Sequence, residues 1–128
     1  MIITNLIIIN ITGMDSAENE ASVQALIQSN KLFAILLTSL FAPIVEEIIY
    51  RKGVFDMVKN KKYYALISGI IFGLIHVIGS ETLSGYLYIV PYGALGYFFA
   101  KSYEETDNIY TSILSHFIHN FICTLISF

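Results

Sequence analysis

Two adjacent glutamates and an arginine at helical spacing are the first candidates for chemistry in this 128-residue chain. Glu47 and Arg51 are four residues apart, so they can pair on one face of a helix. Glu46 points about 100° away from Glu47 around the same helix and lacks that partner. A carboxylate in a medium of low dielectric accepts a proton more readily than one in water. The spacing therefore predicts that Arg51 neutralises the charge of Glu47, which leaves Glu46 free for proton transfer.

A second set of polar side chains lies in later apolar stretches of the chain. Phe72 precedes His76 by four residues, and His116 precedes Asn120 by four, so each pair shares one helical face. Ionisable side chains inside membrane helices are costly and face a bundle interior or a water-filled cavity. We interpret the remaining histidine, His119, as a packing or supporting residue.

The composition indicates which elements must hold these side chains. Hydrophobic residues make up 55% of the chain and charged residues only 13%, whereas soluble domains carry about a quarter charged residues. A membrane-spanning helix needs about 20 mostly apolar residues. The sequence therefore predicts an all-α, polytopic transmembrane helix bundle of about four spanning helices, at residues 32–58, 62–79, 83–100 and 108–127.

Net charge and cysteine content exclude two other classes. The formal net charge of −3 argues against a protein that binds nucleic acid through phosphate contacts. Cys123 is the only cysteine, so no disulfide within the chain and no cysteine-rich metal centre is expected.

The N-terminal part of the sequence differs from the rest. Residues 2–11 are apolar but too short to span a bilayer, and residues 12–30 are polar and acidic with weak helical character at 23–27. We expect residues 1–30 to form an interfacial segment or the remnant of a helix that longer relatives possess. Residues 31–128 are expected to form the functional core.

The distribution of basic residues predicts the orientation. Five of the seven Lys and Arg residues lie between Arg51 and Lys62, and such clusters concentrate on the cytoplasmic side. The acidic connection expected at 101–108 would return to the same side. A helix rises about 1.5 Å per residue. On this count, His76 and His116 lie at the same depth in the bilayer only if the predicted helices 32–58 and 62–79 extend beyond the bilayer where they connect. A hairpin carrying residues 56–62 is therefore expected to protrude.

Small residues and proline predict how the helices pack. Gly69 and Gly73 form a GxxxG pattern, and Gly96 with Ala100 repeats its spacing, which lets helix backbones approach closely in lipid. Pro43 lies one turn before Glu47, so a kink is expected beside the acidic pair.

Together, these polar motifs resemble those of the CPBP family, which is also called Abi. Its members are intramembrane proteases that include CAAX proteases and bacteriocin-processing or immunity proteins. The resemblance covers about residues 32–127 and depends on three motifs that occur here in the family's order: Glu46-Glu47-x-x-x-Arg51, Phe72-x-x-x-His76 and His116-x-x-x-Asn120.

The resemblance implies an intramembrane glutamic endopeptidase without a cofactor. Glu46 and His76 would activate a water molecule, while His116 and Asn120 would stabilise the oxyanion of the tetrahedral intermediate. The supporting residues would be Glu47, Arg51 and Phe72. The substrate would be a membrane-associated peptide or protein. From the position of the basic residues we expect the site to open toward the cytoplasm, and a composition rich in Ile, Asn and Lys indicates a bacterial plasma membrane.

Two other interpretations stay open at this point. Two histidines and one carboxylate are a known catalytic zinc set, so Glu46, His76 and His116 could instead hold zinc in a membrane protease. Alternatively, the chain could be a non-catalytic bacteriocin immunity protein or membrane scaffold, in which the same polar residues would only join helices.

Overall fold

The computed structural model of the chain describes residues 2–13 and 18–126, and these residues form helices without any strand. This confirms the predicted all-α membrane fold. The helices are α1 (Ile2–Thr12), α2 (Glu18–Ser29), a long helix from Lys31 to Met57, α6 (Tyr64–Val77), α7 (Ile89–Thr106) and α8 (Ile109–Ile126). The expected N-terminal segment thus consists of two short helices, with residues 1 and 14–17 outside the described part.

The long helix contains three α-helical segments joined by two wider, π-helical turns. These are α3 (Lys31–Ile35), η1 (Leu36–Phe41), α4 (Ala42–Glu47), η2 (Ile48–Gly53) and α5 (Val54–Met57). Asn30 caps the start, where its side chain accepts a hydrogen bond from the Phe33 N–H. Pro43 lies at the start of α4 and has no N–H to donate, so it interrupts the regular pattern there. The two wide turns flank the single stretch that carries Glu46 and Glu47.

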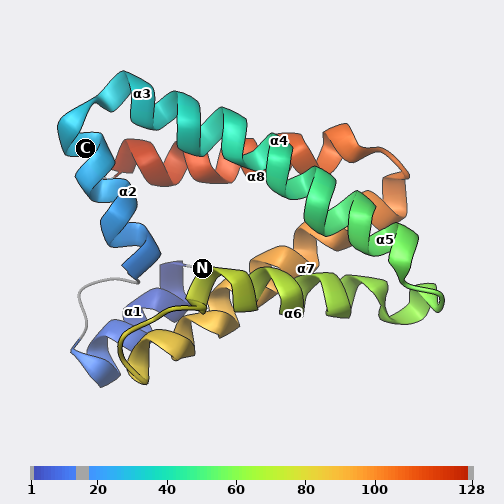
Figure 1. Cartoon of the computed structure of the whole chain (residues 1–128), viewed down its shortest axis with the longest axis horizontal. Coiled ribbons are helices and arrows are strands. Elements are labelled where there is room, and N and C mark those ends of the chain that lie inside the picture. The colour runs from blue at the N-terminus through green and yellow to red at the C-terminus, as the bar shows by residue number, and fades with distance from the viewer. Residues whose placement is uncertain (1, 14–17, 127–128) are drawn as a thin grey trace.

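The helices form two layers (Figure 1). The long helix and α8 lie side by side in the upper layer, and α6 and α7 lie side by side in the lower layer. At one end of the molecule the layers meet at the α5–α6 and α7–α8 connections. At the other end they diverge, and α2 crosses between them.

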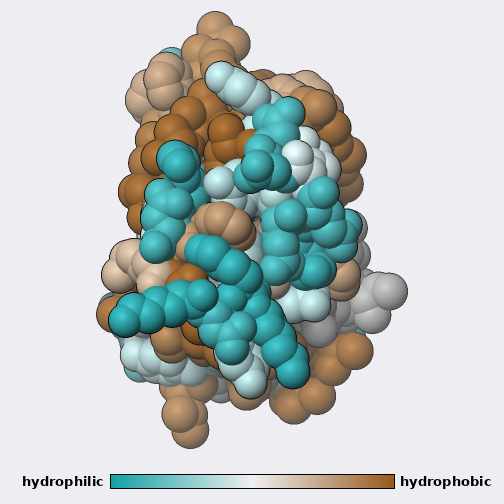
Figure 2. All heavy atoms as spheres, turned by 90° about the vertical axis from the view of Figure 1, so that its right-hand side faces the viewer, coloured by the Kyte–Doolittle hydropathy of each residue, from teal (hydrophilic) through white to brown (hydrophobic). Residues whose placement is uncertain are grey.

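The end at which the layers meet is polar. Figure 2 shows hydrophilic residues gathered on this end, with hydrophobic side chains on the surfaces that flank it. The predicted hairpin is formed by the end of α5, a short connection, the 3₁₀ turn η3 (Lys61–Tyr63) and the start of α6. Its protrusion beyond the bilayer remains a prediction.

The connection expected at residues 101–108 is mostly helical, so this prediction was wrong. Helix α7 continues to Thr106, and the turn is made at Asp107, which has a left-handed φ of 49°. Lys101 contacts Glu104 at 2.6 Å and Glu105 at 3.8 Å. Ion pairs at these spacings support a helix, which explains why the charged stretch did not become a loop.

Among residues 2–13 and 18–126, two helices are long and apolar enough to cross a membrane, namely Lys31–Met57 and α8. Much of their apolar surface faces outward, as illustrated by the exposed side chains of Phe41, Ile48 and Ile122. The start of the predicted third helix is instead the 3₁₀ turn η4 (Ser84–Tyr88), after which α7 begins.

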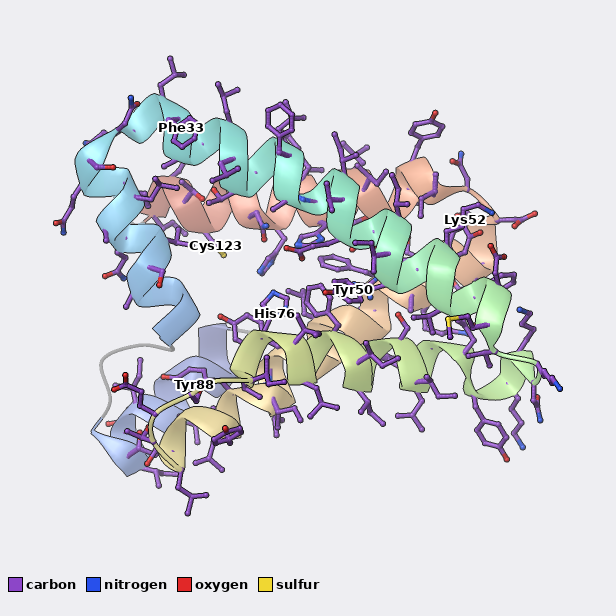
Figure 3. The ribbon with its side chains drawn as sticks, in the orientation of Figure 1. Phe33, Tyr50, Lys52, His76, Tyr88 and Cys123 are labelled. Atoms are coloured by element: carbon purple, nitrogen blue, oxygen red, sulfur yellow. The ribbon has the colours of Figure 1, made fainter. Side chains whose placement is uncertain are left out.

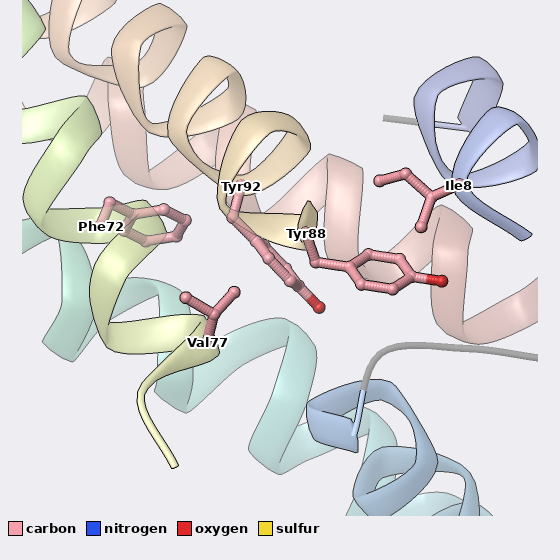
Figure 4. Packing of buried hydrophobic residues seen from close by; sticks show 5 residues of the cluster. All are labelled: Ile8, Phe72, Val77, Tyr88 and Tyr92. Carbon is pink, nitrogen blue, oxygen red and sulfur yellow. The ribbon is translucent and has the colours of Figure 1, made fainter. Parts of the chain in front are cut away.

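The pairing of α6 and α7 depends on glycines, as the GxxxG pattern predicts. A Cβ atom on Gly69 would lie 2.7 Å from the Gly93 carbonyl oxygen, and one on Gly73 would lie 2.8 Å from that of Ile89. Beside this contact, a buried cluster joins α6 and α7 to α1 (Figure 4), with members Ile8, Phe72, Val77, Tyr88 and Tyr92. The lower layer is therefore closely packed next to the motif residues of α6.

Candidate functional site

Glu47 and Arg51 form a completely buried ion pair at the centre of the molecule. The Arg51 Nε donates to Glu47 Oε2 at 2.8 Å, so the pairing expected from their spacing is present. A second guanidinium nitrogen, Nη1, donates to the Ser68 hydroxyl of α6 at 2.9 Å. Ser68 in turn donates to the Tyr50 carbonyl at 2.6 Å. These bonds join the long helix to α6 and compensate the buried charge of Glu47.

The second oxygen of Glu47 faces α8. Glu47 Oε1 lies 2.9 Å from the Nδ1 atom of His116, which is also buried. Because Glu47 already pairs with Arg51 as a carboxylate, His116 Nδ1–H is the donor in this contact. This hydrogen bond holds the Nδ1 side of the His116 ring, so the other ring nitrogen, Nε2, faces Glu46.

Glu46 lies where the imidazoles of α6 and α8 converge. Its Oε2 atom is 4.0 Å from the Nε2 atom of His76 and 3.9 Å from that of His116. This oxygen is buried and has no hydrogen-bond partner among the described residues. Figure 3 shows His76 projecting from α6 into the space between the two layers. A carboxylate oxygen and two ring nitrogens therefore surround one position in the interior.

His76 is held by its own helix and by two aromatic rings. Its Nδ1 atom lies 2.8 Å from the Phe72 carbonyl oxygen, so Nδ1 carries the proton and Nε2 presents a lone pair. The imidazole contacts the Phe72 ring at a centroid distance of 4.3 Å and stacks on Tyr92 at 4.6 Å. Phe72 thus packs against His76, as the sequence indicates, while Tyr92 adds a contact from another helix.

Asn120 lies on the same face of α8 as His116 and contacts the long helix. Its Nδ2 atom donates to the Thr38 carbonyl at 2.9 Å. In the π-helical turn η1, the Ala42 N–H donates to the Leu37 carbonyl, five residues earlier. The next bond in this pattern would run from residue 43 to the Thr38 carbonyl, but Pro43 has no N–H to donate. Asn120 therefore satisfies a carbonyl that the proline leaves without that donor, and it keeps a second amide N–H for another acceptor.

These side chains open into a cavity of about 340 Å³. Its polar lining includes all four residues with expected catalytic roles, and its apolar lining comes from α2, the long helix, α6 and α7. The lining residues include Val23, Leu26, Leu37, Thr38, Glu46, His76, Tyr92, Leu95, His116 and Asn120. The cavity therefore provides open space beside the acidic and imidazole groups.

His119 and Cys123 line the same cavity, and the Cys123 Sγ and His119 Nε2 atoms are 3.6 Å apart. Within residues 2–13 and 18–126, no three His, Cys, Asp or Glu side chains are placed to hold a metal ion. Ligand atoms of one tetrahedral zinc ion lie about 3.4 Å apart, given bonds of roughly 2.0–2.1 Å. The 3.9–4.0 Å separations around Glu46 are wider than that.

Four contributors to the site were not found from the sequence. Ser68 holds Arg51, the Thr38 carbonyl binds Asn120, and the aromatic rings of Tyr92 and Phe99 stack on histidines. Each of them meets its partner from a different helix, so spacing along the chain could not reveal which residue it contacts. Only the positions of Thr38 and Pro43, five residues apart, contained a local signal.

Comparison with known proteins gives matches over most of the chain. Residues 28–122 match the family described as type II CAAX prenyl endopeptidase Rce1-like, and this range contains every motif residue discussed above. The chain is 33% identical over 107 residues to a protein of Bacillus subtilis (strain 168) named "Putative membrane peptidase YdiL", which covers 81% of this chain and 41% of that protein.

A further relative is UPF0177 protein YxdF of Lactococcus lactis subsp. lactis (strain IL1403). It is 29% identical over 80 residues, which correspond to 62% of this chain and 42% of YxdF. The chain thus spans about two fifths of the length of these two relatives. No solved structure matches it.

Proposed function

The chain belongs to the type II CAAX prenyl endopeptidase Rce1-like family, and on that basis we propose that it is an intramembrane glutamic endopeptidase. Its substrate would be a membrane-associated peptide or protein, which it would cleave with a water molecule activated by Glu46. Glu46, His76, His116 and Asn120 are the proposed catalytic residues, supported by Glu47, Arg51 and Phe72.

One observation carries this proposal, namely the environment of Glu46 Oε2. A buried carboxylate oxygen without a hydrogen-bond partner is unfavourable unless another group occupies its surroundings. A water molecule between Glu46 and His76 could donate one hydrogen to Glu46 Oε2 and the other to the lone pair on His76 Nε2. Both atoms are acceptors, and 4.0 Å between them suits a bridging molecule better than a direct bond.

The proposed reaction begins with attack of this water on the scissile carbonyl carbon. The O–H bond that faces Glu46 breaks, its proton moves to Glu46 Oε2, and a new C–O bond forms. The carbonyl oxygen becomes an oxyanion. When the C–N bond then breaks, Glu46 returns the proton to the leaving amine, so the carboxylate is regenerated and one water is consumed for each peptide bond.

Asn120 and His116 are the proposed donors to the oxyanion. Asn120 keeps one amide N–H after its bond to Thr38. His116 gives Nδ1–H to Glu47, so it donates from Nε2 only as an imidazolium, whose charge would be balanced by Glu46. Removal of a single oxyanion donor typically costs about 100-fold or more in turnover.

The family name and the bacterial relatives agree with a peptide substrate at a bacterial membrane. The basic hairpin that contains Lys59, Lys61 and Lys62 would face the cytoplasm. Under this orientation, the polar end of the molecule seen in Figure 2 lies at the cytoplasmic surface.

The experiment uses the purified chain in detergent micelles with a mixed library of synthetic peptides, and mass spectrometry identifies the new termini. The parent chain is expected to cleave a subset of peptides, and Glu46→Gln to reduce the rate at least about 100-fold. Glu105→Gln removes the same charge from an exposed position and should retain the parent rate.

Three results would contradict the proposal. If Glu46→Gln cleaved as fast as Glu105→Gln, Glu46 would not activate the water. If the parent chain cleaved no peptide but bound a bacteriocin or a membrane partner equally well with and without Glu46→Gln, the non-catalytic immunity or scaffold interpretation would hold. Loss of cleavage after dialysis against 1,10-phenanthroline, with recovery on adding zinc, would support the zinc alternative instead.

A further inference from the structure

Helix α7 carries none of the proposed catalytic residues, yet it contacts both catalytic histidines through aromatic rings. Tyr92 stacks on His76 with a centroid distance of 4.6 Å and an interplanar angle of 27°. Phe99 stacks on His116 at 4.6 Å and 24°. Each imidazole therefore lies nearly parallel to one ring of α7.

The stacks restrict a rotation that the hydrogen bonds leave open. His76 is bonded through Nδ1 to the Phe72 carbonyl, and His116 through Nδ1 to Glu47. A single hydrogen bond fixes one nitrogen but allows the ring to turn about the bond axis, which would move Nε2. A parallel aromatic neighbour opposes that turn because the ring would lose its stacking contact.

The backbone of α7 lies close enough to α6 to bring these rings to the site. Tyr92 and Phe99 are seven residues apart, so they point from one face of α7 about 10 Å apart along its axis. Between them, a Cβ atom on Gly96 would lie 2.7 Å from the Cβ atom of Phe72. Glycine at this position lets α7 lie directly behind Phe72, with one aromatic residue on each side of the contact.

We propose that Tyr92 and Phe99 are positioning residues that set the ring planes of His76 and His116, and so direct both Nε2 atoms toward Glu46. This assignment rests on the proposed function, because it gives the histidines their roles in peptide hydrolysis. It adds two residues of α7, which carries none of the three polar motifs, and so extends the site to the long helix, α6, α7 and α8.

Phe99 offers the cleaner test of the two. It is buried and does not line the cavity, so its removal leaves the surface that meets a substrate intact. Tyr92 lines the cavity and could also contact a substrate. The next residue, Phe98, is 67% exposed against 6% for Phe99, which makes Phe98→Leu a matched control on the same helix.

The first measurement is turnover of a peptide that the parent chain cleaves. Phe99→Leu is expected to lower kcat by about tenfold to 100-fold and to leave KM within twofold, since a misplaced catalytic group slows the chemical step. Phe98→Leu should keep both values. Phe99→Tyr retains the ring and should recover most of the lost rate. Equal kcat for Phe99→Leu and Phe98→Leu would overturn the proposal.

The second measurement detects the ring stacking directly and does not require that the chain be active. Proton NMR of the chain in micelles contains the ring signals of only three histidines, which His→Gln variants assign. A parallel aromatic ring shifts these signals upfield. Phe99→Leu should remove most of the shift from His116 and leave His76 unchanged. Tyr92→Leu should reduce the shift of His76, beside which the Phe72 ring stays at 4.3 Å, and leave His116 unchanged.

The two measurements separate the two proposals. If the parent chain shows no turnover, the proposed function fails, while the NMR shifts still decide whether α7 orients the rings. If the His116 signals are the same in Phe99→Leu and in the parent chain, the positioning role is overturned even where cleavage is observed.

Discussion

The two layers of the molecule are held together by different interactions. In the lower layer, α6 and α7 approach so closely at Gly69 and Gly73 that a side chain at either position would meet backbone atoms of α7. In the upper layer, the long helix and α8 are joined by hydrogen bonds. Asn120 donates to the Thr38 carbonyl, and the Thr38 and Thr124 hydroxyls lie 3.3 Å apart.

This difference corresponds to a difference in what each layer contributes. The lower layer contributes the His76 imidazole and the aromatic rings around it, so the position of His76 depends on how closely α6 and α7 pack. The upper layer contributes both glutamates, His116 and Asn120. The positions of these side chains depend on hydrogen bonds between the long helix and α8. In lipid, close packing and interhelical hydrogen bonds are the available ways to join helices, and this chain uses one for each layer.

The connection between the layers should be the most sensitive feature. Arg51 comes from the upper layer, pairs with Glu47 and donates to Ser68 in the lower layer. Arg51→Met would leave the Glu47 carboxylate buried without its cation, and the free energy of unfolding should fall by about 3–5 kcal/mol. Equilibrium unfolding with SDS in mixed micelles measures this change.

The neighbouring pair provides the control for Arg51. Lys52 and Asp56 are also four residues apart, but their side chains are exposed and 3.5 Å apart. Lys52→Met should therefore leave the unfolding curve unchanged. If the two variants lost equal stability, burial would not be what makes the Glu47–Arg51 pair important.

The glycine contact should respond to a single methyl group. Gly73→Ala places a Cβ atom 2.8 Å from the Ile89 carbonyl oxygen and 3.0 Å from the Gly93 nitrogen, so the backbone of α7 must move. Overpacking of this kind should cost about 1–3 kcal/mol in the same unfolding measurement.

A glycine outside the contact distinguishes packing from helix propensity. At Gly53, the nearest atom to an added Cβ is the Ile48 carbonyl oxygen at 3.6 Å, an ordinary contact distance. Gly53→Ala should therefore stabilise the chain by up to about 1 kcal/mol, because alanine is the better helix former. If Gly73→Ala were also stabilising, close approach would not explain how α6 and α7 pair.

Much of this architecture could be predicted from local spacing. The apolar stretches indicated the helices, GxxxG indicated the α6–α7 contact, and the four-residue separation of Glu47 and Arg51 indicated their pair. The family motifs brought Glu46, His76 and His116 together before the fold was considered. In each case, the relevant residues lie within one helix or match a known pattern.

The rest depends on contacts between helices, which spacing along a chain does not encode. Ser68 has no motif around it, and its role exists only because Arg51 reaches it from another helix. The error at residues 101–108 had a different origin, because the charges were interpreted as a loop although Lys101 can pair with Glu104 and Glu105 within a helix. In this stretch, local ion pairs determine the structure more than mean polarity does.

Within the upper layer, Asn120 should contribute to both stability and turnover. Asn120→Ala leaves the Thr38 carbonyl without this donor and should cost about 1–2 kcal/mol of unfolding free energy. It should also lower kcat about 100-fold, since a proposed oxyanion donor is lost. Ser115→Ala on the same helix removes only a bond to the Thr111 carbonyl of α8 itself, and it should change neither value measurably.

The smallest effect is expected at the hydroxyl contact between the same two helices. Thr124→Val keeps the branched shape and removes the contact with Thr38, so the unfolding free energy should fall by about 0.6 kcal/mol, the average for interhelical hydrogen bonds in membranes. Because Asn120 and Thr124 both contact Thr38, the double variant should lose less than the sum of the single losses. If the two losses of unfolding free energy added exactly, the Asn120 and Thr124 contacts would hold α8 independently. Their common partner, Thr38, would then not couple them.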